Sequence, residues 1–83
     1  MKFRKKATVC ELVLFIAPPP DRPVSGDTPV FRRPDGTFAV FNELHKSEIT
    51  LESGDYVNVT TEGDYYPIKA HIVAESYEPV EGV

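Results

Sequence analysis

Five side chains in this sequence have the chemistry to hold a small anionic ligand: Arg32, Arg33, Lys69, Tyr65 and Tyr66. A guanidinium can bind a phosphate through two parallel hydrogen bonds, and a tyrosine ring can stack on a base. Arg32 and Arg33 are neighbours, so on a strand they point to opposite faces and at most one of them lines a given surface. A nucleotide site is therefore one hypothesis, and it depends on a fold that brings distant segments together.

An acidic stretch offers a second kind of binding surface. Between residues 43 and 64 the chain carries one base, Lys46, and six acids: Glu43, Glu48, Glu52, Asp55, Glu62 and Asp64. A surface of this kind could dock a basic host protein or mimic nucleic acid, with Tyr56, Tyr65 or Tyr66 as exposed aromatic anchors. The same acids also suit the solvated outer face of a sheet with polar turns, and both interpretations stay open.

Catalytic chemistry has no support in the sequence. There is no motif of a catalytic nucleophile, a phosphate-binding loop or a metal site. His45 and His71 have no cysteine or carboxylate at a metal-ligand spacing, and Cys10 is the only cysteine. We therefore expect no enzyme, no cofactor and no metal. A single cysteine cannot form an intramolecular disulfide, which suits a reducing cytoplasm.

Size and charge limit the remaining function classes. The 83 residues, 41% of them hydrophobic, predict a single small domain over residues 1–83. The net charge of −4 makes nucleic-acid binding an unfavoured interpretation, because such binding needs a basic footprint. Four bases do gather at the start, and they predict either an electrostatic arm or a charged edge strand: Lys2, Arg4, Lys5 and Lys6.

Membrane insertion and secretion are not expected. The longest apolar run, Leu12 to Ala17, is far shorter than the roughly 20 residues that span a bilayer. The basic start followed by apolar residues resembles a signal peptide superficially. Glu11 interrupts that run, however, and prolines follow it in place of a small-residue cleavage site. We expect a cytoplasmic protein without a membrane partner.

Short segments separated by turn residues must position these side chains. Residues 7–17 are apolar on both parities and favour a central strand buried on both faces, although a buried helical segment fits too. Residues 18–29 are rich in proline and predict a loop. The clearest hairpin joins residues 30–33 to residues 37–41 through Pro34-Asp35-Gly36.

The second half continues this pattern of short strands. Residues 48–52 and 56–60 alternate, so four apolar side chains should face the core: Ile49, Leu51, Val57 and Val59. Pro67 indicates an edge strand or a bulge, and residues 70–74 can form one helical turn. Together these signals predict a mainly β fold, a small antiparallel barrel or sandwich of about five to six short strands with at most one helical turn.

Both ends of the chain carry motifs of a known kind of protein. The start reads Lys2-Phe3-Arg4-Lys5-Lys6. The closing third reads Gly54-Asp55-Tyr56, Gly63-Asp64-Tyr65-Tyr66-Pro67 and Tyr77-Glu78-Pro79-Val80. In these motifs the chain resembles a family of small proteins of tailed bacteriophages and prophages. The resemblance covers about half of the chain, and it departs from the family pattern at Ala7, at Lys69-Ala70-His71 and throughout the middle.

The resemblance implies a phage or prophage accessory protein that works in the cytoplasm of a bacterial host cell. It transfers no catalytic residue. The leading hypothesis is a counter-defence inhibitor that binds a host protein through the acidic residues and tyrosines named above. One alternative is a protein that binds and sequesters a nucleotide signal (a sponge), and another is a minor virion or assembly component. The oligomeric state stays open.

Overall fold

The structure is a computed structural model of the chain, and it describes residues 1–5 and 8–80. Lys6 and Ala7, which belong to the basic cluster and to the predicted central strand, lie outside the described residues. The backbone of the basic segment forms a strand with neighbours on both sides, so it is neither a free arm nor an edge strand.

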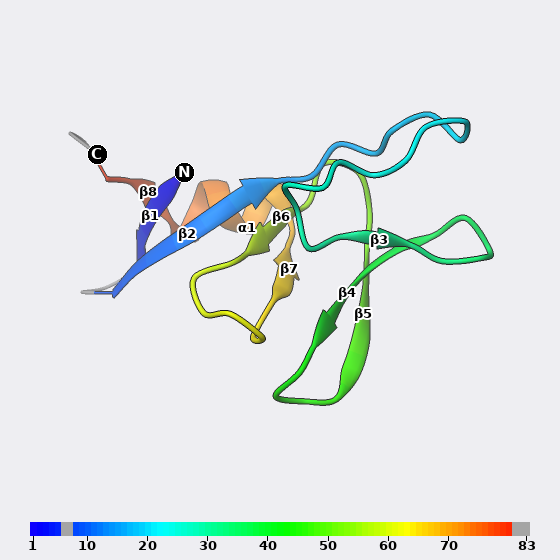
Figure 1. The fold of residues 1–83 in the computed structure, drawn as a ribbon. Coiled ribbons are helices and arrows are strands. Elements are labelled where there is room, and N and C mark those ends of the chain that lie inside the picture. Colours follow the sequence, from blue (N-terminus) through cyan, green and yellow to red (C-terminus); the bar gives the residue numbers. More distant parts are fainter. Residues whose placement is uncertain (6–7, 81–83) are drawn as a thin grey trace.

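The described residues form eight strands and one helix (Figure 1). In chain order these are β1 (Lys2–Lys5), β2 (Thr8–Leu14), β3 (Phe31–Arg32), β4 (Phe38–Asn42), β5 (Ser47–Leu51), β6 (Tyr56–Asn58), β7 (Tyr66–Ile68), α1 (Ala70–Ser76) and β8 (Glu78–Pro79). The predicted mainly β, sandwich-like class is confirmed, and the sheets do not close into a barrel. There are more strands than expected because several pairings involve only two or three residues, and α1, with 7 residues, is longer than a single turn.

The strands form two antiparallel sheets. The larger sheet has the order β7-β6-β2-β1-β8, and the smaller has the order β3-β4-β5. The predicted hairpin is confirmed: Phe31 pairs with Ala39 and Arg32 with Phe38, while Gly36 supplies the positive φ of 87° that the turn requires. Pro67 lies in β7, at an edge of the larger sheet, as its lack of an N–H predicts.

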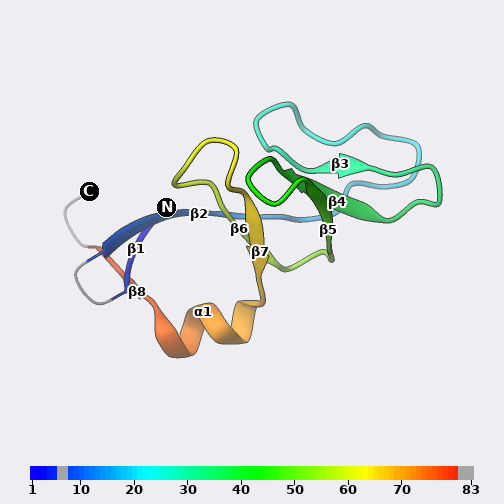
Figure 2. The same cartoon turned by 90° about the horizontal axis from the view of Figure 1, so that it is seen from below.

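The smaller sheet and α1 lie on opposite faces of the larger sheet (Figure 2). A first core fills the space between the two sheets and contains Phe15, Val30, Val40, Leu51 and Val57, with Ile49 and Val59 packed against it. A second core lies under α1 and contains Leu12, Ile68 and Val73. Leu12 of β2 and Tyr56 of β6 contact the second core. Phe15, just after β2, and Val57 of β6 belong to the first core, because successive side chains of an extended chain point to opposite faces.

The last part of the predicted central strand differs from expectation. Leu12 is fully buried and Phe15 is 4% exposed, but Leu14 and Ile16 are 48% and 65% exposed. The prediction of burial on both faces is therefore wrong for the end of the strand, where Phe15 is buried on one face while Leu14 and Ile16 are exposed on the other. The reason is that the second core reaches Leu12 and goes no further along the strand.

In the part of the chain that the structure describes, no helix has the length and the apolar character needed to cross a bilayer.

Candidate functional site

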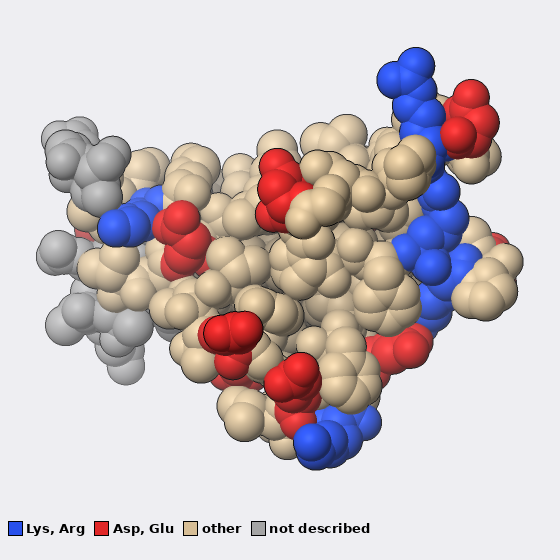
Figure 3. All heavy atoms as spheres, viewed as in Figure 1, with Lys and Arg blue, Asp and Glu red and all other residues tan. Residues whose placement is uncertain are grey.

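Several of the acidic residues between positions 43 and 64 lie beside cations of the chain itself. In the view of Figure 3 the Asp and Glu side chains lie in separate groups, several of them next to Lys or Arg. Glu48 lies 3.4 Å from the guanidinium of Arg33, and Glu52 lies 3.5 Å from Nζ of Lys69. The predicted docking surface is thus partly neutralised by the cations of the chain itself.

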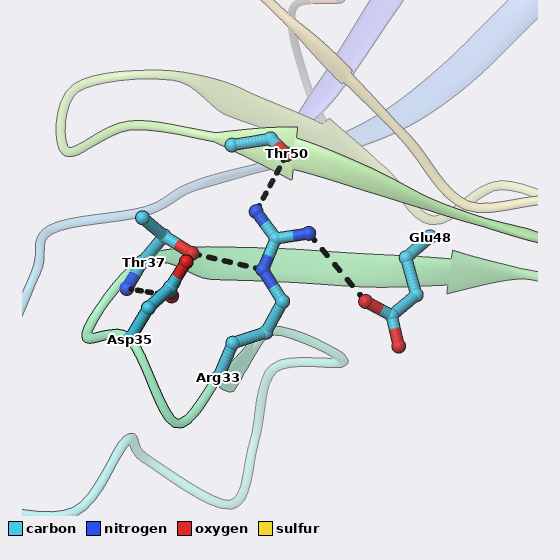
Figure 4. A network of polar contacts seen from close by, with 5 residues as sticks. All are labelled: Arg33, Asp35, Thr37, Glu48 and Thr50. Carbon is cyan, nitrogen blue, oxygen red and sulfur yellow. Dashed lines mark hydrogen bonds and ion pairs between the residues drawn. The ribbon is translucent and has the colours of Figure 1, made fainter.

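Arg33 is held by three side chains (Figure 4). Its Nε donates to Thr37 Oγ1 at 2.8 Å, its Nη2 donates to Thr50 Oγ1 at 2.6 Å, and its Nη1 faces Glu48. Asp35 completes the network by accepting the hydroxyl of Thr37 at 2.6 Å, and this hydrogen bond lowers the pKa of the Asp35 carboxyl. The guanidinium therefore fastens the β3–β4 turn to β5 through three of its five N–H donors.

Arg32 points away from Arg33, as expected of neighbours on a strand. Its guanidinium lies 5.3 Å from the ring centroid of Phe38, and it donates to the carbonyl oxygens of Arg22 at 2.8 Å and Pro19 at 3.2 Å. Carbonyl oxygens that accept from a guanidinium fix its position. Arg32 thus anchors the proline-rich loop, residues 18–29, against the smaller sheet.

Lys69 and Asp55 form a half-buried ion pair at the turn between β5 and β6. Lys69 Nζ lies 3.2 Å from Asp55 Oδ2, and the same oxygen accepts the backbone N–H of Glu52 at 2.9 Å. The hydrogen bond to Asp55 raises the pKa of Lys69. Asp55 itself is only 5% exposed, so it stabilises the turn and is not available to a partner protein.

The three tyrosines lie in different environments. Tyr65 packs against the first core and Tyr56 against the second core. Tyr66 is the most exposed of the three at 37%, and its hydroxyl accepts a hydrogen bond of 2.9 Å from Asn58 Nδ2. Partial burial raises the pKa of Tyr66. Tyr65 and Tyr66 make no hydrogen bond or cation–π contact with Arg32, Arg33 or Lys69 among the described residues, so the nucleotide site considered from the sequence gains no support.

Sequence reasoning missed a different feature, at the end of β2. A hollow of about 430 Å³ lies there between residues 13–16 and the returning part of the loop, including Pro23, Val24 and Asp27. We call it the β2-end hollow. Leu14 and Ile16, both largely exposed, belong to its lining. The only signal in the sequence was that both parities of residues 12–17 are apolar, and that signal was interpreted as burial.

Metal binding has no support in the part of the chain that is described. Within residues 1–5 and 8–80, no group of three or more His, Cys, Asp or Glu side chains is placed to hold an ion. Comparison of the chain with models of protein families, with curated proteins and with solved structures gives no match. The candidate site is therefore argued from its own geometry.

Proposed function

We propose that this protein is an accessory protein of phage or prophage type that acts by binding a host protein, with the β2-end hollow as its contact surface. The observation that carries the proposal is the exposure of Leu14 and Ile16 beside this hollow. Two large aliphatic side chains exposed next to a concave surface are typical of a protein-binding site. The phage-like motifs at the two ends of the sequence support the setting.

The charge around the hollow favours a protein over a nucleotide as the ligand. Among the described residues that line the hollow, Asp27 alone is charged, and a carboxylate repels phosphate. The cations that the nucleotide hypothesis needs are bonded elsewhere, Arg33 to Thr50 and Lys69 to Asp55. Binding a host protein without chemical change is enough to block its surface, which is how a counter-defence inhibitor would act.

The test is capture of partners from a bacterial host lysate by three tagged forms of the chain. The wild type is compared with Ile16→Asp and with Leu44→Asp. Leu44, 69% exposed in the turn between β4 and β5, is a matched control because it offers a similar exposed aliphatic side chain away from the hollow. We expect one host protein to be retained by the wild type and by Leu44→Asp, and to be lost with Ile16→Asp.

Three results would contradict the proposal. Equal capture by Ile16→Asp would remove the β2-end hollow as the contact surface. A nucleotide retained without any protein would favour the sponge. Recovery of the bait alone, as an oligomer, would favour a virion or assembly component. Circular dichroism of all three forms shows whether the substitutions leave the fold intact.

A further inference from the structure

The backbone of β2 has a free edge at its end. Phe15 donates its N–H to the carbonyl of Asp55 at 2.9 Å and accepts from Gly54 at 2.8 Å, and Ala17 donates to Ser53 Oγ at 2.9 Å. Successive residues of a strand present their backbone groups to opposite sides. The N–H and C=O groups of Leu14 and Ile16 therefore point away from β6.

The neighbour on that other side stops too early to bind them. β1 pairs with β2 from Thr8 to Glu11, and its last contact is the hydrogen bond of 2.8 Å from the N–H of Leu12 to the carbonyl of Met1. Beyond this point, no backbone hydrogen bond from Leu14 or Ile16 to another described residue occurs on this side. A row of unpaired donors and acceptors next to exposed aliphatic side chains is thus left open.

Three edge strands of the described structure, β7, β8 and β5, carry residues that discourage pairing. β7 contains Pro67, β8 contains Pro79, and β5 carries Glu48 on its exposed face. Proline and charge are the usual means of protecting an edge. Residues 13–17 contain neither, and Pro18 ends the row of free donors directly after Ile16 and Ala17. An edge of this kind is suited to pairing with another chain.

We infer that the end of β2 binds an extended segment of the partner protein as an added strand. This inference rests on the proposed function and states how the partner protein would be bound. Main-chain hydrogen bonds to Leu14 and Ile16 would give affinity, and pockets for alternate side chains would give specificity. The segment should be apolar at alternate positions, to cover Leu14 and Ile16, and should carry a Lys or Arg that reaches Asp27, the charged residue of the lining.

The shape of the hollow favours a single extended chain over a second copy of this protein. β2 forms one wall, and the returning loop, with Pro23 and Val24, forms the opposite wall. A strand with a folded domain behind it would have to displace the loop, which Arg32 holds in place.

The test begins with selection of a binding peptide from a random display library, with peptides of about eight residues, long enough for one strand. The best enriched peptide is synthesised, and amide exchange is measured by NMR with and without it. We expect the N–H groups of Leu14 and Ile16 to become protected on binding. Val13 and Phe15, already bonded to the β6 side, should change little.

Two substitutions of Ile16 separate the contribution of its backbone N–H to binding from that of its side chain. Ile16→Pro removes the free N–H without breaking an internal hydrogen bond, whereas Ile16→Val keeps the N–H and most of the side chain. We expect Ile16→Pro to weaken peptide binding about tenfold, and Ile16→Val to change it by no more than about twofold.

The failure of this inference can be told apart from the failure of the proposed function. If Ile16→Asp abolishes capture of the host protein while Ile16→Pro does not, the surface binds through side chains only and strand addition is wrong. Enriched peptides that leave Leu14 and Ile16 unprotected, or no enrichment at all, also overturn it. Protection of both amides in an oligomer without peptide would assign the edge to a second copy, which overturns it as well.

Discussion

Asn42 of β4 donates a side-chain hydrogen bond of 2.9 Å to Asp64, in the segment that connects β6 to β7. The same amide group donates to the carbonyl of Tyr65 at 3.1 Å, and its oxygen accepts the N–H of His45 at 3.0 Å. Asn42 is only 1% exposed. A single buried amide thus joins the smaller sheet to the larger one and fixes the β4–β5 turn.

Replacing this amide should therefore be costly. We expect Asn42→Ala to lower the free energy of unfolding by about 1–3 kcal/mol, since it leaves buried donors and acceptors without partners. Urea denaturation measures the change. The control is Thr61→Ala, an exposed substitution in the same connecting segment, which should stay within about 0.5 kcal/mol of the wild type. An Asn42→Ala value as small as that of the control would show that the link between the sheets contributes little.

Lys69 should make stability fall at alkaline pH. Its pKa is raised by the hydrogen bond to Asp55, so its contribution is complete below the unfolded-state pKa, about 10.4, and is lost as the pH rises through the folded-state pKa. We expect Lys69→Met to be less stable than the wild type at neutral pH, and the difference to shrink above about pH 10.5.

The matched control for Lys69→Met is Lys46→Met. Lys46 is exposed and makes no ion pair with any residue that the structure describes. Denaturation series from neutral to alkaline pH compare the two. Parallel curves for Lys69→Met and the wild type over the whole range would mean that the ion pair with Asp55 contributes nothing. The pKa of Tyr66 is also raised, so its ionisation lowers the stability of the wild type and of both variants as the pH rises.

Asp35 should make stability fall at acidic pH. The hydroxyl of Thr37 lowers the pKa of this carboxyl, so the contribution is present above the unfolded-state pKa, about 3.9, and is lost as the pH falls through the folded-state pKa. We expect Asp35→Asn to flatten the loss of stability below about pH 4. Asp21→Asn, an exposed substitution in the proline-rich loop, is the matched control. Identical profiles for Asp35→Asn and the wild type would contradict this expectation.

The helix depends on one buried side chain. Val73 is 3% exposed and is the buried residue of α1, where it packs with Leu12 and Ile68. We expect Val73→Ala to cost about 1–3 kcal/mol, because it removes buried methyl groups and opens a cavity. Ile72→Ala, at a position 39% exposed on the same helix, should cost much less. Equal unfolding midpoints for the two variants would show that the second core does not hold α1.

Local patterns predicted a large part of this fold. The alternation around Leu51 and Val57 placed both in the first core, and Pro34-Asp35-Gly36 placed the β3–β4 turn, because both signals act between near neighbours in sequence. The pairing of Lys69 with Asp55 and of Arg33 with Thr50 joins segments 14 and 17 residues apart and depends on how the sheets pack. For the same reason the predicted acidic surface and nucleotide site could not be judged from residue types alone.

The end of β2 shows most clearly what could not be predicted from the sequence. Residues 12–17 are apolar on both parities, and that pattern predicts burial on both faces. Whether Leu14 and Ile16 are covered depends on how far β1 and α1 extend along the strand, and no local pattern encodes that length. The exposed apolar edge is therefore visible only in three dimensions.

The most direct test of the central claim, that the end of β2 is an open strand edge, is amide hydrogen exchange on the protein alone. We expect the amides of Leu14 and Ile16 to exchange at nearly unprotected rates, and those of Val13 and Phe15 to be protected by their bonds to the β6 side. Equal protection at all four amides in a monomeric sample would contradict the claim, because the edge would then be covered by the chain itself.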